Sequence, residues 1–138
     1  EDRDNFDKRT AQLANQYSQY EVLPGRKLNG ELTLGENIAD LGGAKAAFRA
    51  YKISLKGEPS PIIDNYTGEQ RFFIGTAQSD RVKFRDEIYE MRVATSVHSP
   101  SRFRVDGVII NMKEFHKAFS TEKGDKLYKS DDDIILIW

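Results

Sequence analysis

Apolar side chains in the first part of the chain recur at alternating spacings of four and three residues. The positions with this spacing are Phe6, Thr10, Leu13, Tyr17 and Tyr20. Such spacing puts side chains on one face of a helix, and it predicts a helix over residues 3–22 with one buried stripe. Pro24 and Gly25 are expected to stop this helix.

A second helical pattern opens after Gly30 and runs to about Ile53. Thr33 and Glu36 have the spacing of a capping box, in which two side chains bond each other's backbone N–H groups at a helix start. The apolar stripe of this second helix consists of Leu41, Ala44, Phe48 and Tyr51.

Further helices are predicted beyond a proline-containing loop at residues 56–68. A capping box of Thr67 and Gln70 predicts a third helix. Its inward residues are expected to be Phe72, Phe73 and Ala77. Helical spacing resumes at Phe84, Ile88 and Met91. This fourth helix should end at residues 98–100, because a residue before proline avoids the helical region.

The last third of the chain has a less regular pattern. Residues 102–110 carry Asp106-Gly107 between apolar pairs, which fits either a hairpin turn or an irregular connection. Asn111 and Glu114 predict the cap of one last short helix bearing Phe115 and Phe119. The apolar residues 134–138 are expected to dock onto the rest of the chain. The whole pattern predicts a mainly α protein with few or no strands.

Composition narrows the class of protein. The 138 residues suffice for one modest domain with a core. A net charge of -1 argues against nucleic-acid binding, which calls for a basic patch. No apolar run approaches the roughly 20 residues of a membrane span. The chain has no cysteine, which excludes disulfides and thiolate metal sites. It begins with Glu1 in a helix-like stretch, so we expect a piece of a longer protein.

Two carboxylates in the second helix pattern need an explanation. At about 100° per residue, Glu36, Asp40, Gly43 and Ala47 share a narrow sector beside the apolar stripe. Lys45, Arg49 and Lys52 lie on the opposite side. Glycine at positions 42 and 43 costs about 1 kcal/mol each inside a helix, which suggests that another backbone approaches there.

Structural and functional explanations of this pair compete. Glu36 could be only the capping partner of Thr33, and Asp40 only an early-turn acid favoured by the helix dipole. Neither explains Asn37. The functional explanation is a zinc site, in which one carboxylate binds the metal and another orients a ligating histidine. The chain has only His98 and His116, and neither lies in an H-E-x-x-H pattern, so it cannot complete such a site alone.

Two long motifs carry a family resemblance. They are LNGELTLGENIADLGGAKAAFRAYK at residues 28–52 and HSPSRFRVDGVIINMKEFHKAF at residues 98–119, followed by the closing IW. They resemble the neprilysin and endothelin-converting-enzyme family of zinc metallopeptidases, which includes bacterial oligopeptidases. The resemblance spans nearly all of residues 1–138. It implies the C-terminal helical lobe of a thermolysin-like zincin catalytic domain, with the H-E-x-x-H portion upstream of Glu1.

The resemblance also implies roles for single residues. Glu36 is similar to the family's third zinc ligand, and Asp40 to the aspartate that hydrogen-bonds a zinc-binding histidine. His98 resembles the histidine that steadies the oxyanion of the reaction. Arg104 matches the arginine that holds a backbone carbonyl of the substrate. Taken without the resemblance, His98 would be a helix C-cap and Arg104 a surface or ion-pair residue.

Some positions depart from the family pattern. Many relatives have an aspartate at the position of Ser96, so a carboxylate partner for His98 is missing. Asp106 replaces a frequent asparagine and adds negative charge near Arg104. The cysteine of animal members is absent, which suits a bacterial member. His116 is expected to be exposed, and residues 130–134 to form a solvated turn rather than a calcium loop.

Two functions follow as hypotheses. The first is the C-terminal part of a zinc-dependent metalloendopeptidase that hydrolyses peptides, inactive as an isolated chain and dependent on one Zn²⁺ that needs upstream histidines. The alternative is a non-catalytic helical interaction module derived from that fold. The expected partners are peptide substrates and the upstream part of the same protein. The isolated chain is expected to self-associate or to be partly disordered, around residues 28–45. The resemblance implies an extracytoplasmic parent, whether periplasmic, secreted or membrane-anchored.

Overall fold

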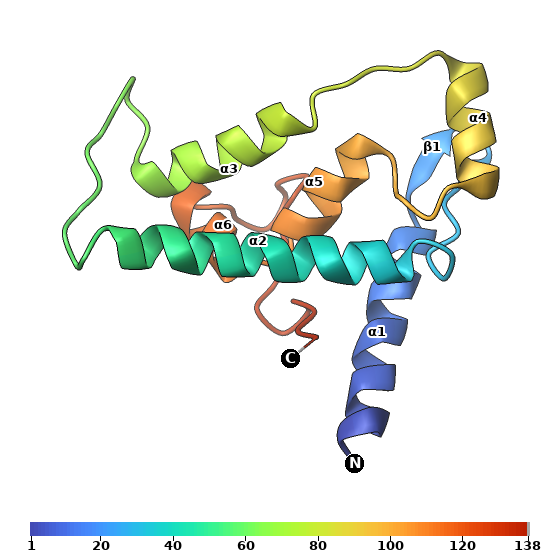
Figure 1. Ribbon diagram of the computed structural model, residues 1–138, viewed down its shortest axis with the longest axis horizontal. Coiled ribbons are helices and arrows are strands. Elements are labelled where there is room, and N and C mark those ends of the chain that lie inside the picture. The colour runs from blue at the N-terminus through green and yellow to red at the C-terminus, as the bar shows by residue number, and fades with distance from the viewer. Residues whose placement is uncertain (138) are drawn as a thin grey trace.

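The computed structural model describes residues 1–137 and consists there of six helices and a small two-stranded sheet (Figure 1). The helices are α1 (Asp2–Ser18), α2 (Leu34–Ser54), α3 (Gly68–Ser79), α4 (Asp86–Thr95), α5 (Ser101–Ile109) and α6 (Lys113–Phe119). The strands β1 (Glu21–Leu23) and β2 (Arg26–Lys27) pair antiparallel. The prediction of a mainly α chain with few strands is confirmed.

Helix α2 is the central element of the fold. It contacts α1 and α5, while α3 contacts both α5 and α6. In Figure 1, α2 runs across the molecule, with α3 and α5 on one side of it and α1 crossing near its N-terminal end. The core between these helices is built largely from aromatic and aliphatic side chains, among them Leu13, Tyr17, Leu41, Phe48, Phe73, Phe103, Val108, Met112 and Phe115.

Helix α1 is shorter than the pattern predicted. It ends at Ser18 because the chain turns into the β1–β2 hairpin. Leu13 and Tyr17 are buried as expected, whereas Phe6 is 44% exposed near the free end of the helix. Tyr20, just past the helix, stacks on Phe103 of α5 with ring centroids 4.6 Å apart.

Residues 102–110 form neither a hairpin nor an irregular connection, so both predictions for this segment were wrong. Residues 102–109 belong to α5, Ile110 is its C-cap, and Gly107 is a helical residue. A Cβ atom at Gly107 would lie 2.7 Å from Cζ and Oη of Tyr17. Glycine is therefore required by the close packing of α5 against α1, which local sequence does not reveal.

Only one of the three predicted helix caps forms. Thr67 and Gln70 make the complete capping box of α3. Thr33 makes no side-chain cap at α2 and bonds Asn29 and Asn37 instead. Asn111 likewise does not cap α6, since its side chain is buried and bonds α1 and the C-terminal segment.

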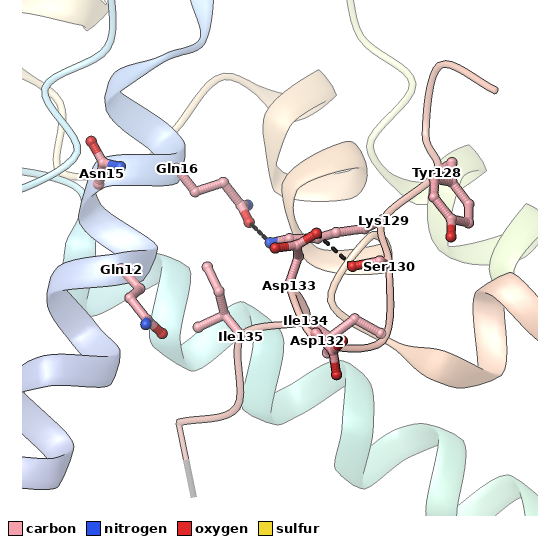
Figure 2. Close-up of a pocket in the computed structure, with 10 residues that line it drawn as sticks. All are labelled: Gln12, Asn15, Gln16, Tyr128, Lys129, Ser130, Asp132, Asp133, Ile134 and Ile135. Atoms are coloured by element: carbon pink, nitrogen blue, oxygen red, sulfur yellow. Dashed lines mark hydrogen bonds between the residues drawn. The ribbon is translucent and has the colours of Figure 1, made fainter. Parts of the chain in front are cut away.

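The C-terminal segment docks along α1, as expected for its apolar residues. Ile134, Ile135 and Ile137 are buried, and Trp138 lies outside the described residues. Lys129 donates hydrogen bonds of 2.8 Å to Gln16 Oε1 and Asn111 Oδ1. Figure 2 shows the bond from Lys129 to Gln16, which joins this segment to α1.

Four smaller expectations have different outcomes. Ala77 is exposed rather than inward. The apolar spacing around α4 does mark a helix, but Met91 is 55% exposed and α4 buries no residue. His116 is not simply exposed, because its ring nitrogens lie 2.7 Å from Thr121 Oγ1 and 3.0 Å from Ile110 O. The carboxylates at 131–133 are exposed, as predicted for a solvated turn.

No helix among residues 1–137 combines the length and the apolar character needed to cross a membrane.

Candidate metal and substrate site

Glu36 and Asp40 lie one turn apart on α2 and face residues from the other end of the chain. Glu36 Oε2 is 3.1 Å from His98 Nε2, and Asp40 bonds Arg104. The structure thus brings together the four residues that the sequence singled out. The Glu36 and His98 side chains are 41% and 51% exposed, so both can reach an additional group.

Asn37 holds the His98 loop against α2. Its amide donates to Thr33 Oγ1 at 2.9 Å, and its carbonyl oxygen accepts from Ser99 Oγ at 2.8 Å. Both Asn37 and Ser99 are buried. Because Ser99 directly follows His98, this bond holds the backbone from which the His98 side chain reaches Glu36. The sequence flagged Asn37 as unexplained but did not connect it with Ser99.

Ser96 shapes the backbone of the same loop. Its hydroxyl accepts from His98 N–H and donates to His98 C=O, each at 3.1 Å. Helix α4 ends just before it, at Thr95. The hydroxyl therefore supports the main chain of His98, and the ring's carboxylate contact is Glu36.

Asp40 and Arg104 form a bidentate ion pair. Arg104 Nε and Nη2 donate to the two carboxylate oxygens at 2.8 and 2.7 Å. These hydrogen bonds, together with the charges of Asp40, Asp80 and Glu36, raise the pKa of Arg104 above its usual value. Asp106, expected to act on Arg104, instead pairs with Arg102 at 3.2 Å.

Within residues 1–137 there is no cluster of three groups that could hold a metal ion. Of the two carboxylates in this patch, Asp40 is engaged by Arg104, whereas Glu36 has no arginine or lysine partner among the ion pairs of residues 1–137. Glu36 is not used as a helix cap, and one of its oxygens reaches only the His98 ring. Such a side chain fits one ligand of a zinc site whose other ligands come from elsewhere.

The small residues after Asp40 line an open groove between α2, α3 and α5, of about 340 Å³. A Cβ added at Gly43 would meet nothing within 4 Å, so the expected close backbone is not found there among residues 1–137.

Comparison with known protein families assigns the chain to one of them. The family model "Peptidase family M13" matches residues 1–134. The chain therefore belongs to peptidase family M13, which confirms the resemblance that the two motifs carried.

Individual relatives agree with this assignment. The chain is 40% identical over 128 residues to Neprilysin-3 of Drosophila melanogaster, covering 90% of this chain and 16% of that protein. It is 42% identical over 125 residues to human endothelin-converting enzyme 1, covering 88% of this chain and 16% of that protein. The chain thus spans about a sixth of the length of these relatives.

Solved structures give the same result. The chain superimposes on the zinc metalloprotease Zmp1 of Mycobacterium tuberculosis bound to an inhibitor with a TM-score of 0.95 and 41% identity. The match covers 99% of this chain and 22% of that one. The open state of the same protease matches with a TM-score of 0.93.

Proposed function

We propose that this chain is the C-terminal part of the catalytic domain of a zinc-dependent endopeptidase and does not hydrolyse peptides alone. The observation that carries the proposal is the meeting of Glu36 and Asp40 with His98 and Arg104 across one patch. Membership of peptidase family M13 supports the reaction class.

Glu36 is the proposed third zinc ligand, with two histidines supplied from upstream of Glu1. Its half-exposed carboxylate and lack of a capping role support this assignment. Zinc held by three protein ligands would supply Lewis acidity and a water whose pKa falls to about 7.

Asp40 is proposed to orient one of the upstream zinc-binding histidines. Each carboxylate oxygen has two acceptor sites, so bonding Arg104 leaves room for an imidazole N–H. Such a bond sets the tautomer of a ligating histidine and raises its basicity.

His98 and Arg104 are proposed to stabilise the substrate. The His98 ring would donate to the carbonyl oxygen that gains negative charge during hydrolysis, and Arg104 would hold a neighbouring backbone carbonyl. The loop bonded through Asn37 and Ser99 supports a fixed position for His98. Removing one such donor typically lowers the rate about 10²–10³-fold.

The partners proposed are peptide substrates and the upstream part of the same protein. The resemblance also leads us to infer a parent that acts outside the cytoplasm.

Glu36→Gln tests the proposal in the full-length protein that contains this chain. We expect loss of stoichiometric zinc and of peptide hydrolysis, because a neutral amide is a poor zinc ligand. Glu31→Gln is the matched control, since Glu31 is an exposed loop residue. Zinc is measured by atomic absorption and hydrolysis with a fluorogenic peptide. A zinc-replete, active Glu36→Gln protein would refute the ligand assignment.

Two further observations test the division of the site between this chain and its upstream part. The isolated chain should hold no tightly bound zinc, and a stoichiometric ion there would contradict a half-site. An upstream sequence without H-E-x-x-H would remove the peptidase proposal and leave the non-catalytic helical module.

A further inference from the structure

Three polar side chains are buried between the start of α2 and the loop that carries His98. Thr33, Asn37 and Ser99 are 2%, 0% and 4% exposed, so bulk water cannot replace the partners of their polar atoms. Ser99 Oγ donates to Asn37 Oδ1 at 2.8 Å. Asn37 Nδ2 donates to Thr33 Oγ1 at 2.9 Å, and Thr33 Oγ1 donates to Asn29 C=O at 3.2 Å. Because a buried polar group without a partner is costly, the members of this hydrogen-bond chain depend on one another.

The hydrogen-bond chain can run in only one direction. A carbonyl oxygen only accepts, so the single hydrogen of the Thr33 hydroxyl goes to Asn29 C=O. The Thr33 oxygen must then accept from Asn37, which turns its NH₂ group toward Thr33 and its carbonyl oxygen toward Ser99. The Asn37 amide therefore has one fixed orientation, and it calls for a donor at position 99.

This hydrogen-bond chain takes the place of a local helix cap. Thr33 and Glu36 have the spacing of a capping box, but both the N–H and the hydroxyl of Thr33 bond Asn29 C=O, and Thr33 makes no cap. The start of α2 therefore forgoes the stabilisation that a capping box gives. In its place, α2 gains a buried bond to a residue 62 positions away, and the Glu36 carboxylate faces His98.

The buried bond is the main polar connection between this loop and α2. Within residues 1–137, two polar side-chain contacts join loop residues 96–99 to α2, from Ser99 to Asn37 and from His98 to Glu36. The side chains of the second contact are partly exposed, whereas both partners of the first are buried. Helix α4, which leads into the loop, has no buried residue. The position of the loop therefore depends on the hydrogen bond of Ser99.

We propose that Asn37 and Ser99 are positioning residues for peptide hydrolysis, which set the place of the His98 imidazole relative to Glu36. Glu36 and Asn37 are neighbours on α2, and His98 and Ser99 are neighbours in the loop. The buried bond therefore holds the backbone of the proposed zinc ligand and the backbone of the proposed oxyanion donor at a fixed separation. The inference rests on the proposed function and adds the residues that keep its donor in place.

The test uses the full-length protein, a fluorogenic peptide and a zinc assay. Ser99→Ala and Asn37→Ala should each lower kcat about 10–100-fold, because a small displacement of a reacting group has an effect of this size. KM and the stoichiometric zinc content should stay as in wild type. Thr10→Val is the control, since Thr10 is also buried but its hydroxyl bonds Asp7 C=O within α1, and its kcat should equal that of wild type.

A second comparison separates positioning from a general loss of structure. Ser99→Ala is made both in wild type and in His98→Ala, which itself should lower kcat about 10²–10³-fold. If Ser99 acts through the imidazole, its removal changes kcat by less than about twofold once His98 is gone, because residues that act as a unit are not additive. A purely structural role would lower kcat by the same factor in both backgrounds.

The outcomes separate this inference from the proposed function. A Ser99→Ala protein with wild-type kcat, with lost zinc, or with the same fall in kcat in both backgrounds overturns the positioning role and leaves the peptidase assignment intact. A fully active His98→Ala protein overturns the role of His98 and this inference with it. A wild-type protein that hydrolyses no peptide overturns the proposed function as well.

Discussion

Asp40 and Arg104 are separated by 64 residues in sequence and share two hydrogen bonds. The pair matters because each member has a second proposed task, Asp40 toward an upstream histidine and Arg104 toward the substrate. The planar guanidinium matches both carboxylate oxygens at once, which a lysine ammonium cannot do. Substitutions on the two sides should therefore have different consequences.

Arg104→Lys in the full-length protein should lower kcat/KM about tenfold and leave the zinc content unchanged, because it removes one charge-assisted hydrogen bond. Asp40→Ala should in addition weaken zinc binding about 10–100-fold, as loss of an orienting carboxylate does. Zinc titration and peptide kinetics measure the two effects. Arg102→Lys is the control, since Arg102 is exposed and its ion-pair partner within residues 1–137 is Asp106 on the same helix, outside the proposed site. Equal zinc affinity in Asp40→Ala and wild type would contradict the role of Asp40.

At the scale of elements, the contact of α1 with α5 positions Arg104. Gln16 of α1 donates to Gly107 C=O of α5 at 2.9 Å, and the Tyr17 ring lies against Gly107. Arg104 is one turn before Gly107 on the same helix. The close α1–α5 contact that excludes a side chain at position 107 therefore also fixes the part of α5 from which Arg104 bonds Asp40.

Gly107→Ala should destabilise the protein by about 1–3 kcal/mol, the usual cost of overpacking a buried contact. Gly75→Ala is the control in α3. A Cβ there meets nothing within 4 Å, so alanine should be neutral or stabilising by up to about 1 kcal/mol. Chemical denaturation compares the two variants with wild type. If Gly107→Ala is as stable as Gly75→Ala, the close approach of Tyr17 does not constrain α5.

At the scale of the whole molecule, Lys129 connects the C-terminal segment with α1 and the end of α5. Its ammonium bonds Gln16 and Asn111, and Asn111 also accepts from Ile135 N–H. Burial lowers the pKa of Lys129 from 10.5 to about 8, against the opposing effect of the Asp133 charge. Holding the charged form in this position therefore costs stability at neutral pH.

The free energy of unfolding should increase as the pH rises above 8, because the unfolded chain then binds the Lys129 proton more tightly than the folded one. The free energy of unfolding of wild type and of Lys129→Met is measured by chemical denaturation from pH 7 to 10. The difference between the two proteins is then compared across this pH range. This difference should be constant below pH 8 and shift in favour of wild type above it. Lys126→Met, at an exposed position, should keep the wild-type slope. If the free energy of unfolding of Lys129→Met rises with pH as steeply as that of wild type, Lys129 does not titrate in this way.

Exposed apolar side chains are distributed over several elements, including Leu32 before α2 and Met91 on α4. They are compatible with the predicted self-association of the isolated chain, which stays a prediction. The upstream part of the protein would be the natural cover for such a surface.

The sequence by itself determined the helical class, the existence of α1 to α4 and of α6, the cap of α3 and the family. These follow from periodicity and capping within one or two turns and from two contiguous motifs, which need no knowledge of distant contacts. It also marked Glu36, Asp40, His98 and Arg104 as a set, although their roles remain proposals.

Only the tertiary structure decided what depends on residues far apart in sequence. Position 107 requires glycine because the Tyr17 ring of α1 occupies the space where a Cβ atom would lie. Asn111 serves α1 and the C-terminal segment rather than its own helix. Local sequence patterns indicate which residues share a helix face. Which residues of other elements contact that face is decided by tertiary packing.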